Sequence, residues 1–189
     1  MTSTSLEFTP AEAAALANVP EPEVRKELEY HVLPKATPPR LSFAALVYLQ
    51  AKTRIGIELT VKDRTALFKK VEGALSRKRR VSSVEVSDLL KLKISPVVSE
   101  VRHRLKHFHA WERKRVVSSP DVLGGEPVFK GSRLSVRHIG GMLERGESEK
   151  NIRADYRELS KDDLAFSRLF VRAYPRVGRP PETGEAPPR

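Results

Sequence analysis

The chain has 189 residues, of which 39% are hydrophobic and none is cysteine, and its formal net charge is +11. This composition suffices for a modest core, and the lack of cysteine excludes disulfides and thiolate metal sites. We expect a cytoplasmic protein, because no apolar run approaches the ~20 residues of a membrane span and the first residues lack the pattern of a signal peptide.

The positive charge is concentrated in the middle of the chain. Residues 1–61 carry 6 basic and 7 acidic side chains, residues 62–115 carry 16 and 6, and residues 116–189 carry 13 and 11. A basic segment of this kind is often only a solvated face. It also favours polyanionic partners, and nucleic acid is the partner that we expect.

Two short helices separated by a tight turn are predicted within residues 9–31. Thr9 has the chemistry of an N-cap, because proline follows at the first helical position and Glu12 lies three residues on, as in a capping box. The turn at residues 18–20 contains a proline that ends this helix. A second helix is predicted over residues 22–30.

Three prolines within residues 31–40 favour an extended loop or a small wing. An apolar helix over residues 43–52 follows, and a stripe of apolar side chains predicts another helix over residues 60–77. That helix ends in four consecutive cations, which are Arg77, Lys78, Arg79 and Arg80.

Residues 81–94 favour two short strands, and the second alternates lysine with the apolar residues Leu90, Leu92 and Ile94. Because an unpaired strand edge invites a symmetric partner, we expect these three residues to form a dimer contact. A helix over residues 95–109 is predicted next.

The last third of the chain predicts a strand at residues 116–117, a turn-rich stretch, and three short helices over residues 136–144, 149–156 and 162–173. Prolines and glycines after residue 174 are typical of a flexible tail.

The opening of the chain resembles a known class of regulators. Residues 8–20, FTPAEAAALANVP, with Val24 and Arg25 after them, resemble the first helix-turn-helix of MerR-like winged-helix proteins. The proline-rich turn and the helix to Lys52 would correspond to the wing and its supporting helix. This resemblance implies DNA binding, with the start of the second helix in the major groove.

A longer match lies in the last third. Residues 118–134, SSPDVLGGEPVFKGSRL, followed by Glu144-Arg145-Gly146 and Leu159-Ser160, resemble the trihelical antitoxin domain of VapB-type proteins. The match covers residues 111–174, about a third of the chain. It implies an antitoxin, often dimeric, that binds a PIN-type ribonuclease toxin and represses its own operon.

We therefore expect a mainly α fold with short β-strands. The domains predicted are an amino-terminal MerR-like winged helix-turn-helix over residues 1–58, a basic linker or dimerisation segment over 59–110, a carboxyl-terminal trihelical, helix-turn-helix-like domain over 111–174, and a tail over 175–189.

Contacts to DNA are predicted for the helix pair, the proline-rich turn and the central cations. Arg25 is the best candidate for reading guanine, because a guanidinium can donate twice to one base edge. The glutamates of the same helix would repel phosphate, so a purely structural role for this helix is the alternative. The predicted DNA-binding residues are Thr9, Glu23, Arg25, Lys26, Lys35, Arg40, Arg77, Lys78, Arg79 and Arg80.

Contacts to the toxin are predicted for the carboxyl-terminal segment. A PIN-type nuclease gathers carboxylates around a metal, so an arginine on a flexible tail can pair with them and block the substrate. The aromatic side chains, at helical spacing, are more typical of a bundle core than of an interface. The predicted toxin-binding residues are Phe166, Leu169, Phe170, Arg172, Tyr174, Arg176 and Arg179.

The sequence shows no set of residues with the pattern of a catalytic site or a metal site. His103, His107 and His109 lack a clustered acidic ligand and are surrounded by cations, which would oppose a metal ion. The glycines of residues 124–131 fit neither a P-loop nor a dinucleotide motif. We therefore predict no enzyme activity, no metal site and no cofactor.

The function predicted is that of an antitoxin, which binds operator DNA with its amino-terminal and central parts and sequesters a ribonuclease toxin with its carboxyl-terminal part, as a homodimer. The alternative is a stand-alone MerR-like regulator whose last domain senses a ligand or another protein. A nucleic-acid enzyme that uses the central histidines is a weaker third alternative.

Overall fold

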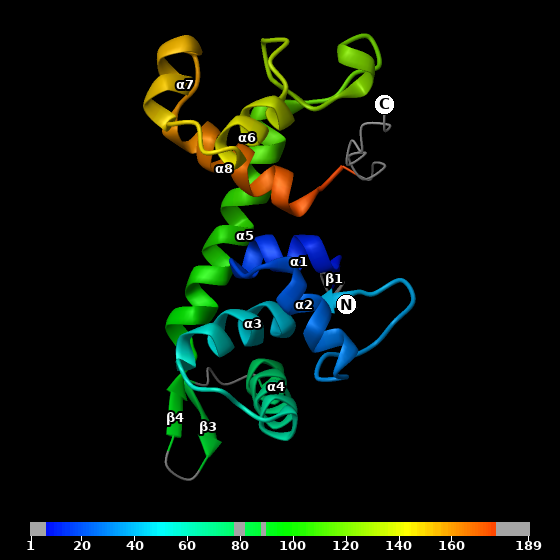
Figure 1. Cartoon of the computed structure of the whole chain (residues 1–189), viewed down its shortest axis with the longest axis vertical. Coiled ribbons are helices and arrows are strands. Elements are labelled where there is room, and N and C mark those ends of the chain that lie inside the picture. Colours follow the sequence, from blue (N-terminus) through cyan, green and yellow to red (C-terminus); the bar gives the residue numbers. More distant parts are fainter. Residues whose placement is uncertain (1–6, 78–81, 88–89, 177–189) are drawn as a thin grey trace, which may run out of the picture.

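The computed structural model describes residues 7–77, 82–87 and 90–176. These residues are mainly helical, with short two-stranded antiparallel sheets, as the sequence predicts. Helix α5 (Ser95–Arg115) runs along the long axis of an elongated molecule and connects its two ends (Figure 1). Within the described ranges, no helix combines the length and the apolar character that crossing a membrane requires.

The amino-terminal half begins with a helix pair. The elements of this half are β1 (Glu7–Phe8), α1 (Pro10–Ala17), α2 (Glu21–Glu29), β2 (Leu41–Ser42), α3 (Phe43–Ile55) and α4 (Val61–Ser76). Thr9 caps α1 in a capping box with Glu12, as predicted. Asn18 takes the left-handed conformation, with φ 55° and ψ 51°, and turns the chain into α2.

The proline-rich segment 31–40 contains no strand, so the wing expected there is not confirmed. Instead, β2 pairs antiparallel with β1, with Leu41 opposite Phe8. Because β1 precedes α1 and β2 follows α2, this pairing joins the two ends of the segment that contains the first two helices. Proline has no N–H to donate to a strand ladder, so the prolines of this segment do not favour a strand there.

The carboxyl-terminal half begins where α5 ends. Its elements are β5 (Val116–Val117), the short helical turn Leu123–Gly125, β6 (Val128–Phe129), α6 (Val136–Glu144), α7 (Glu149–Asp155) and α8 (Lys161–Ala173), close to the predicted spans. Ser135, Ser148 and Ser160 each cap the helix that follows by accepting from the backbone amide three residues on. Helix α8 packs against α6 on one side and against α1 on another.

The middle of the chain packs closely on both halves. Helix α4 lies along α3, and the hairpin of β3 (Ser83–Ser87) and β4 (Leu90–Lys93) packs on α4. Helix α5 contacts α3, α1 and α8 in turn. The segment 59–110, which the sequence suggests as a linker, is therefore integrated into the folded body.

Helix α1 joins the two halves into one core. It consists mostly of alanine, and its side chains are buried; Ala13 and Ala17 expose no surface. Because an alanine side chain is a single methyl group, α3 and α8 can both approach the backbone of α1 closely. The buried hydrophobic residues consequently form one cluster that runs through both ends of the molecule.

A glycine sets the close approach of α6 to α8. A Cβ atom at Gly140 would lie 2.5 Å from Val171 Cγ1 and closer still to the carbonyl oxygen of Ser167. A Cβ atom at the neighbouring Gly141 would meet only the end of the Arg145 side chain, at 3.3 Å. A Cβ atom is therefore accommodated at Gly141 but overlaps with α8 at Gly140.

We predict that Gly140→Ala lowers the free energy of unfolding by about 1–3 kcal/mol, because the overlap with α8 outweighs the gain in helix propensity. Gly141→Ala, the matched control, should be neutral or stabilising by up to about 1 kcal/mol. Urea unfolding followed by circular dichroism measures both. Equal midpoints for the two variants would contradict the close packing at Gly140.

Candidate functional site

The candidate nucleic-acid surface begins at the α1–α2 pair. Helix α1 is buried, whereas α2 is amphipathic, with Val24 and Glu27 facing the core and Arg25, Lys26 and Glu29 exposed. Helix α2 therefore presents cations together with one carboxylate on its outer face.

The buried carboxylate of Glu27 ties α2 to the two helices behind it. Its side chain exposes no surface and accepts hydrogen bonds from the Tyr48 hydroxyl at 2.8 Å, from Lys52 Nζ at 2.9 Å and from Arg64 Nη1 at 2.5 Å. Burial and the neighbouring Glu27 carboxylate raise the pKa of Tyr48 far above its usual value, so Tyr48 stays a donor. The orientation of α2 is thus fixed by charge-assisted hydrogen bonds.

Two further glutamates of α2 also have partners within the protein. Glu21 accepts from Arg25 at 2.5 Å, and Glu23 lies 3.5 Å from Lys52 Nζ. The sequence placed Glu23 among the DNA contacts, but in the structure it faces Lys52. The acidic character that argued against DNA binding is therefore largely offset inside the fold, although Arg25 is engaged as well.

The other predicted DNA contacts are spread over the amino-terminal half. The Thr9 hydroxyl accepts from the amide of Glu12, so it serves first as the cap of α1. Lys35 and Arg40 are exposed in the segment before β2, and Arg77 is exposed after α4. The remaining cations of this set, Lys78, Arg79 and Arg80, lie outside the described residues.

A cationic cleft between α4 and β3 adds residues that the sequence analysis did not single out. It has a volume of about 450 Å³ and is lined by Lys69, Lys70 and Arg77 on one wall and by Ser83 and Glu85 on the other. The signal was available, because Leu67, Phe68 and Val71 mark the buried face of α4 and thereby place both lysines on the outer face.

The predicted dimer contact is only partly accessible. Leu90 and Leu92 are half-buried in the β3–β4 hairpin, but Ile94 exposes no surface. The strand ends at Lys93, and Ile94 precedes α5 with its side chain in the core, so the described fold gives Ile94 no surface for a dimer contact.

The predicted toxin contacts divide into core and surface residues. Phe166 and Phe170 are buried, so they cannot anchor a partner as expected. The Phe166 ring centroid lies 5.3 Å from that of Phe108, and the Phe170 centroid lies 4.9 Å from that of Tyr174. Burial raises the pKa of Tyr174 to about 12. These aromatic residues form the core between α5 and α8, at the helical spacing that the sequence already associates with cores.

The surface members of this set are arginines paired with glutamates. Arg172 Nη2 lies 2.9 Å from Glu144, and Arg176 Nη2 lies 3.6 Å from Glu126. The Arg176 side chain is 76% exposed, and Leu169 is half-buried. Arg179 lies outside the described residues.

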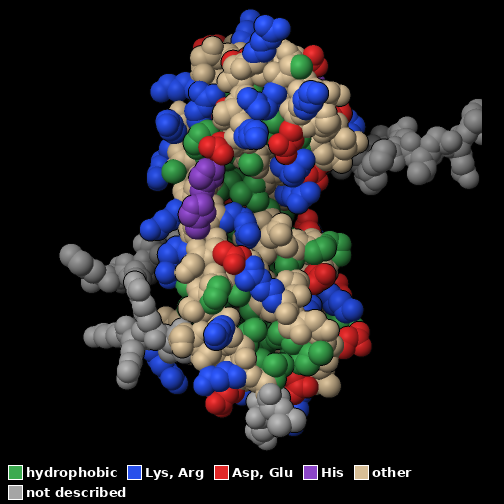
Figure 2. All heavy atoms as spheres, turned by 90° about the vertical axis from the view of Figure 1, so that its left-hand side faces the viewer, with side chains coloured by type: hydrophobic (Ala, Val, Ile, Leu, Met, Phe, Trp, Pro, Cys, Tyr) green, Lys and Arg blue, Asp and Glu red, His purple; other side chains and the backbone are tan. Residues whose placement is uncertain are grey.

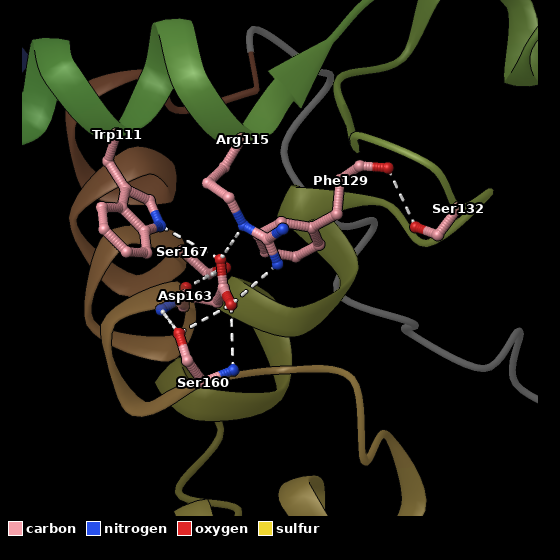
Figure 3. Close-up of polar contacts among 7 residues, drawn as sticks. All are labelled: Trp111, Arg115, Phe129, Ser132, Ser160, Asp163 and Ser167. Carbon is pink, nitrogen blue, oxygen red and sulfur yellow. Dashed lines mark hydrogen bonds and ion pairs between the residues drawn. The ribbon is translucent and has the colours of Figure 1, made fainter.

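A second buried carboxylate, Asp163, holds α8 against the end of α5 (Figure 3). Asp163 accepts from Trp111 Nε1 at 3.0 Å and from Arg115 at 3.0 and 3.1 Å, and it closes a capping box with Ser160. Burial alone would raise the pKa of Asp163, but the hydrogen bonds from Arg115, Ser160 and Trp111 outweigh it and lower that pKa.

A groove opens at the waist of the molecule, where the two halves meet. This waist groove has a volume of about 640 Å³ and is walled by α1, α5 and α8, from which Ala15, His103, His107, Arg168 and Leu169 contribute side chains. Figure 2 shows histidine side chains at the narrow middle of the molecule, beside hydrophobic and cationic ones. Over the described ranges, no three His, Asp or Glu residues cluster in a way that could hold a metal ion.

The Asp163 cluster generates a prediction about pH. Folding lowers the pKa of the Asp163 carboxyl below its value in the unfolded chain, which is about 3.9. The ionised carboxylate therefore stabilises the fold fully above that pH, and this stabilisation is lost as the pH falls through the lower pKa of the folded protein. Asp163→Asn should lower the free energy of unfolding by about 2–4 kcal/mol at pH 7. The difference from wild type should shrink below about pH 4.

The matched control is Asp162→Asn, since Asp162 is exposed in the same first turn of α8 and should change stability by less than about 0.5 kcal/mol. Urea titrations at several pH values measure both variants. A difference for Asp163→Asn that persisted unchanged to pH 2 would refute the ionised cluster.

Comparisons with known proteins find a family match in the carboxyl-terminal half and two relatives along most of the chain. Residues 116–170 match the family described as "Protein of unknown function (DUF433)". The chain is similar to uncharacterized protein y4eO of Sinorhizobium fredii, with 25% identity over 195 residues, which covers 94% of this chain and 86% of that protein. It is also similar to the crystal structure of Rv2018 from Mycobacterium tuberculosis, at 20% identity with a TM-score of 0.30, over 85% of this chain and 96% of that one. The segment from β5 to α8 is thus a DUF433 domain.

Proposed function

We propose that this chain is the antitoxin of a type II toxin–antitoxin system, which binds operator DNA and inhibits a PIN-type ribonuclease toxin. The observation that carries the proposal is the arrangement of charge on α2. Glu27 is turned into the core and Glu23 toward Lys52, so the outer face presents Arg25, which pairs with Glu21, and Lys26, together with the carboxylate of Glu29. This face lies on the second helix of the α1–α2 pair, which we interpret as a helix-turn-helix, and the second helix is the one with which such modules meet DNA.

Further exposed cations lie on α4 and directly after it. Lys69 and Lys70 are exposed on α4, and Arg77 adjoins them in the cleft against β3. Contacts of lysine and arginine to phosphate supply most of the affinity for DNA without regard to its sequence. We assign contacts with the phosphate backbone to the α4–β3 cleft, and contacts with a groove of the DNA to the outer face of α2.

The toxin-binding part of the proposal rests on the antitoxin-like sequence of residues 118–134 and on two arginines, one in the last turn of α8 and one after it. Arg172 and Arg176 pair with Glu144 and Glu126 near the surface. Exposed ion pairs contribute little net stability, so a cluster of carboxylates on a partner can replace these glutamates at low cost. The half-buried Tyr174 belongs to the core and holds the start of the tail in place.

A stand-alone regulator with a ligand-sensing carboxyl-terminal domain is the second candidate function. The observation that favours it is the waist groove, which is walled by α1 of the helix pair and by α8 of the DUF433 domain. In this alternative, the DNA surface is the same, and the partner protein is replaced by a small molecule.

We predict that Arg25→Gln combined with Lys26→Gln weakens binding to a promoter fragment of the protein's own operon. If each residue contacts one phosphate, the slope of log affinity against log salt should fall by about 1.8, since each lost contact removes about 0.9. Fluorescence anisotropy at several salt concentrations measures this slope.

The matched control for charge is Lys150→Gln combined with Arg157→Gln, which removes two exposed cations from the DUF433 domain instead. This control should leave the slope unchanged. If the control flattens the slope and the α2 pair does not, the assignment of DNA binding to α2 is wrong.

We predict that Arg176→Gln weakens inhibition of the toxin by roughly tenfold, because it removes a charge-assisted contact to the toxin's carboxylates. A chain ending after Pro175 should weaken inhibition further, while Tyr174 keeps its place in the core. The measurement is RNA cleavage by the product of the adjacent gene at increasing amounts of this chain. Arg157→Gln is the control, and equal inhibition by all four forms would exclude the tail from the contact.

A further inference from the structure

The waist groove has the size and composition of a small-molecule site. Its volume of about 640 Å³ lies within the range of roughly 300–1,000 Å³ that is typical of ligand pockets. Leu169 and Ala165 supply its accessible apolar surface, and the buried rings of Phe108 and Phe166 lie beneath. A few polar groups converge on this surface, which is the usual pattern of a site that binds an apolar body and orients it.

The charge of the lining selects an anion. His103, His107, Arg104, Arg168 and Arg172 line the groove. Among the described lining residues the acidic one is Glu100, and its carboxylate is already engaged by Arg54 and Gln50. The potential in the groove is therefore positive.

The guanidinium groups differ in their availability. Arg104 is committed to the carbonyl oxygen of Leu16 at 2.5 Å and so belongs to the wall. Arg168 lies 3.7 Å from Glu149, a loose pair between side chains that are 40% and 49% exposed. Since such exposed pairs are weak, Arg168 can turn toward a ligand carboxylate at little cost.

Flat rings on α5 favour a flat ligand. The rings of His103 and His107 are stacked, with centroids 6.2 Å apart and planes 21° apart, and the His107 ring stacks in turn on Trp111 at 5.3 Å and 12°. His103 is the exposed end of this stack and lines the groove. An aromatic ring placed against His103 would extend the stack by one member.

We propose that the waist groove binds a small aromatic carboxylate, with its ring against His103 and the apolar surface of α8 and its carboxylate at Arg168. The walls come from the helix pair and from the DUF433 domain, so an occupant touches both halves of the protein. The inference supplies the ligand class and the site for the second candidate function, but it stands equally if the protein inhibits a toxin.

The test uses the full-length protein and naphthalene-2-carboxylate as the probe, with the uncharged 2-naphthamide as its partner compound. Titration calorimetry should show saturable binding of the carboxylate and binding of the amide that is weaker by roughly tenfold, since a charge-assisted hydrogen bond is lost. Equal affinity for the two compounds, or no binding of either, overturns the proposal.

Two variants locate the probe, each with a matched control. Arg168→Gln should weaken binding of the carboxylate by roughly tenfold without changing that of the amide, whereas Arg113→Gln, on an exposed part of α5 outside the groove, should change neither. Ala165→Phe should fill the groove and abolish binding of both compounds, whereas Ala110→Phe, at an exposed position of α5, should not. Probe binding that survives Ala165→Phe would mean that the site lies elsewhere.

The same four variants separate this inference from the proposed function. Neither Arg168 nor Ala165 belongs to the DNA or toxin contacts assigned above. If the wild-type protein neither binds the promoter fragment nor inhibits the toxin, the proposed function is refuted and the probe titrations are unaffected. A failed titration would leave the DNA and toxin experiments unaffected.

Discussion

The rest of the structure depends on a helix whose side chains are small enough to be enclosed. Helix α1 lies between α3 and α8, and its alanines allow both neighbours to approach its backbone. Larger side chains at Ala13 or Ala17 would force one neighbour outward, at a cost typical of overpacked cores. The amino-terminal helix pair and the DUF433 domain would then lose their common core, and the waist groove would lose a wall.

Two buried carboxylates decide how distant segments meet around this core. Glu27 connects α2 to α3 and α4, and Asp163 connects α8 to the end of α5. Desolvation offsets most of the attraction in a buried ion pair, so neither cluster adds much net stability. Removing one partner, however, leaves a buried charge alone, which is costly. Arrangements that separate these partners are therefore penalised, and the orientation of α2 and α8 becomes unique.

The sequence predicted what local chemistry controls. Thr9 with Glu12, and the serines before α7 and α8, have short-range partners that a linear pattern displays, so the helix starts were correct. The apolar spacing likewise predicted α4 and the start of α5, although α5 continues to Arg115, beyond the end predicted at residue 109. These features need no knowledge of what lies across the core.

The errors concern side chains whose surroundings come from distant segments. Ile94 continues an alternating strand pattern, yet the chain turns into a helix there and buries it. Glu27 counted among the glutamates of its helix that were expected to repel phosphate, because its partners Tyr48 and Arg64 lie 21 and 37 residues away. The aromatic residues of α8 have the spacing of a core as well as of an interface, and only the position of Phe108 on α5 decides between the two.

The waist groove lies next to the turn that sets the direction of α2. Asn18 lines the groove, and its left-handed backbone sets the direction in which the chain leaves α1. An occupant in contact with Asn18 therefore acts on the helix pair directly, without a chain of intervening residues. It can shift the orientation of α2 only by as much as it binds one orientation better than another. Because the Glu27 cluster resists such a shift, a ligand of modest affinity would stabilise the existing arrangement of α2 rather than replace it.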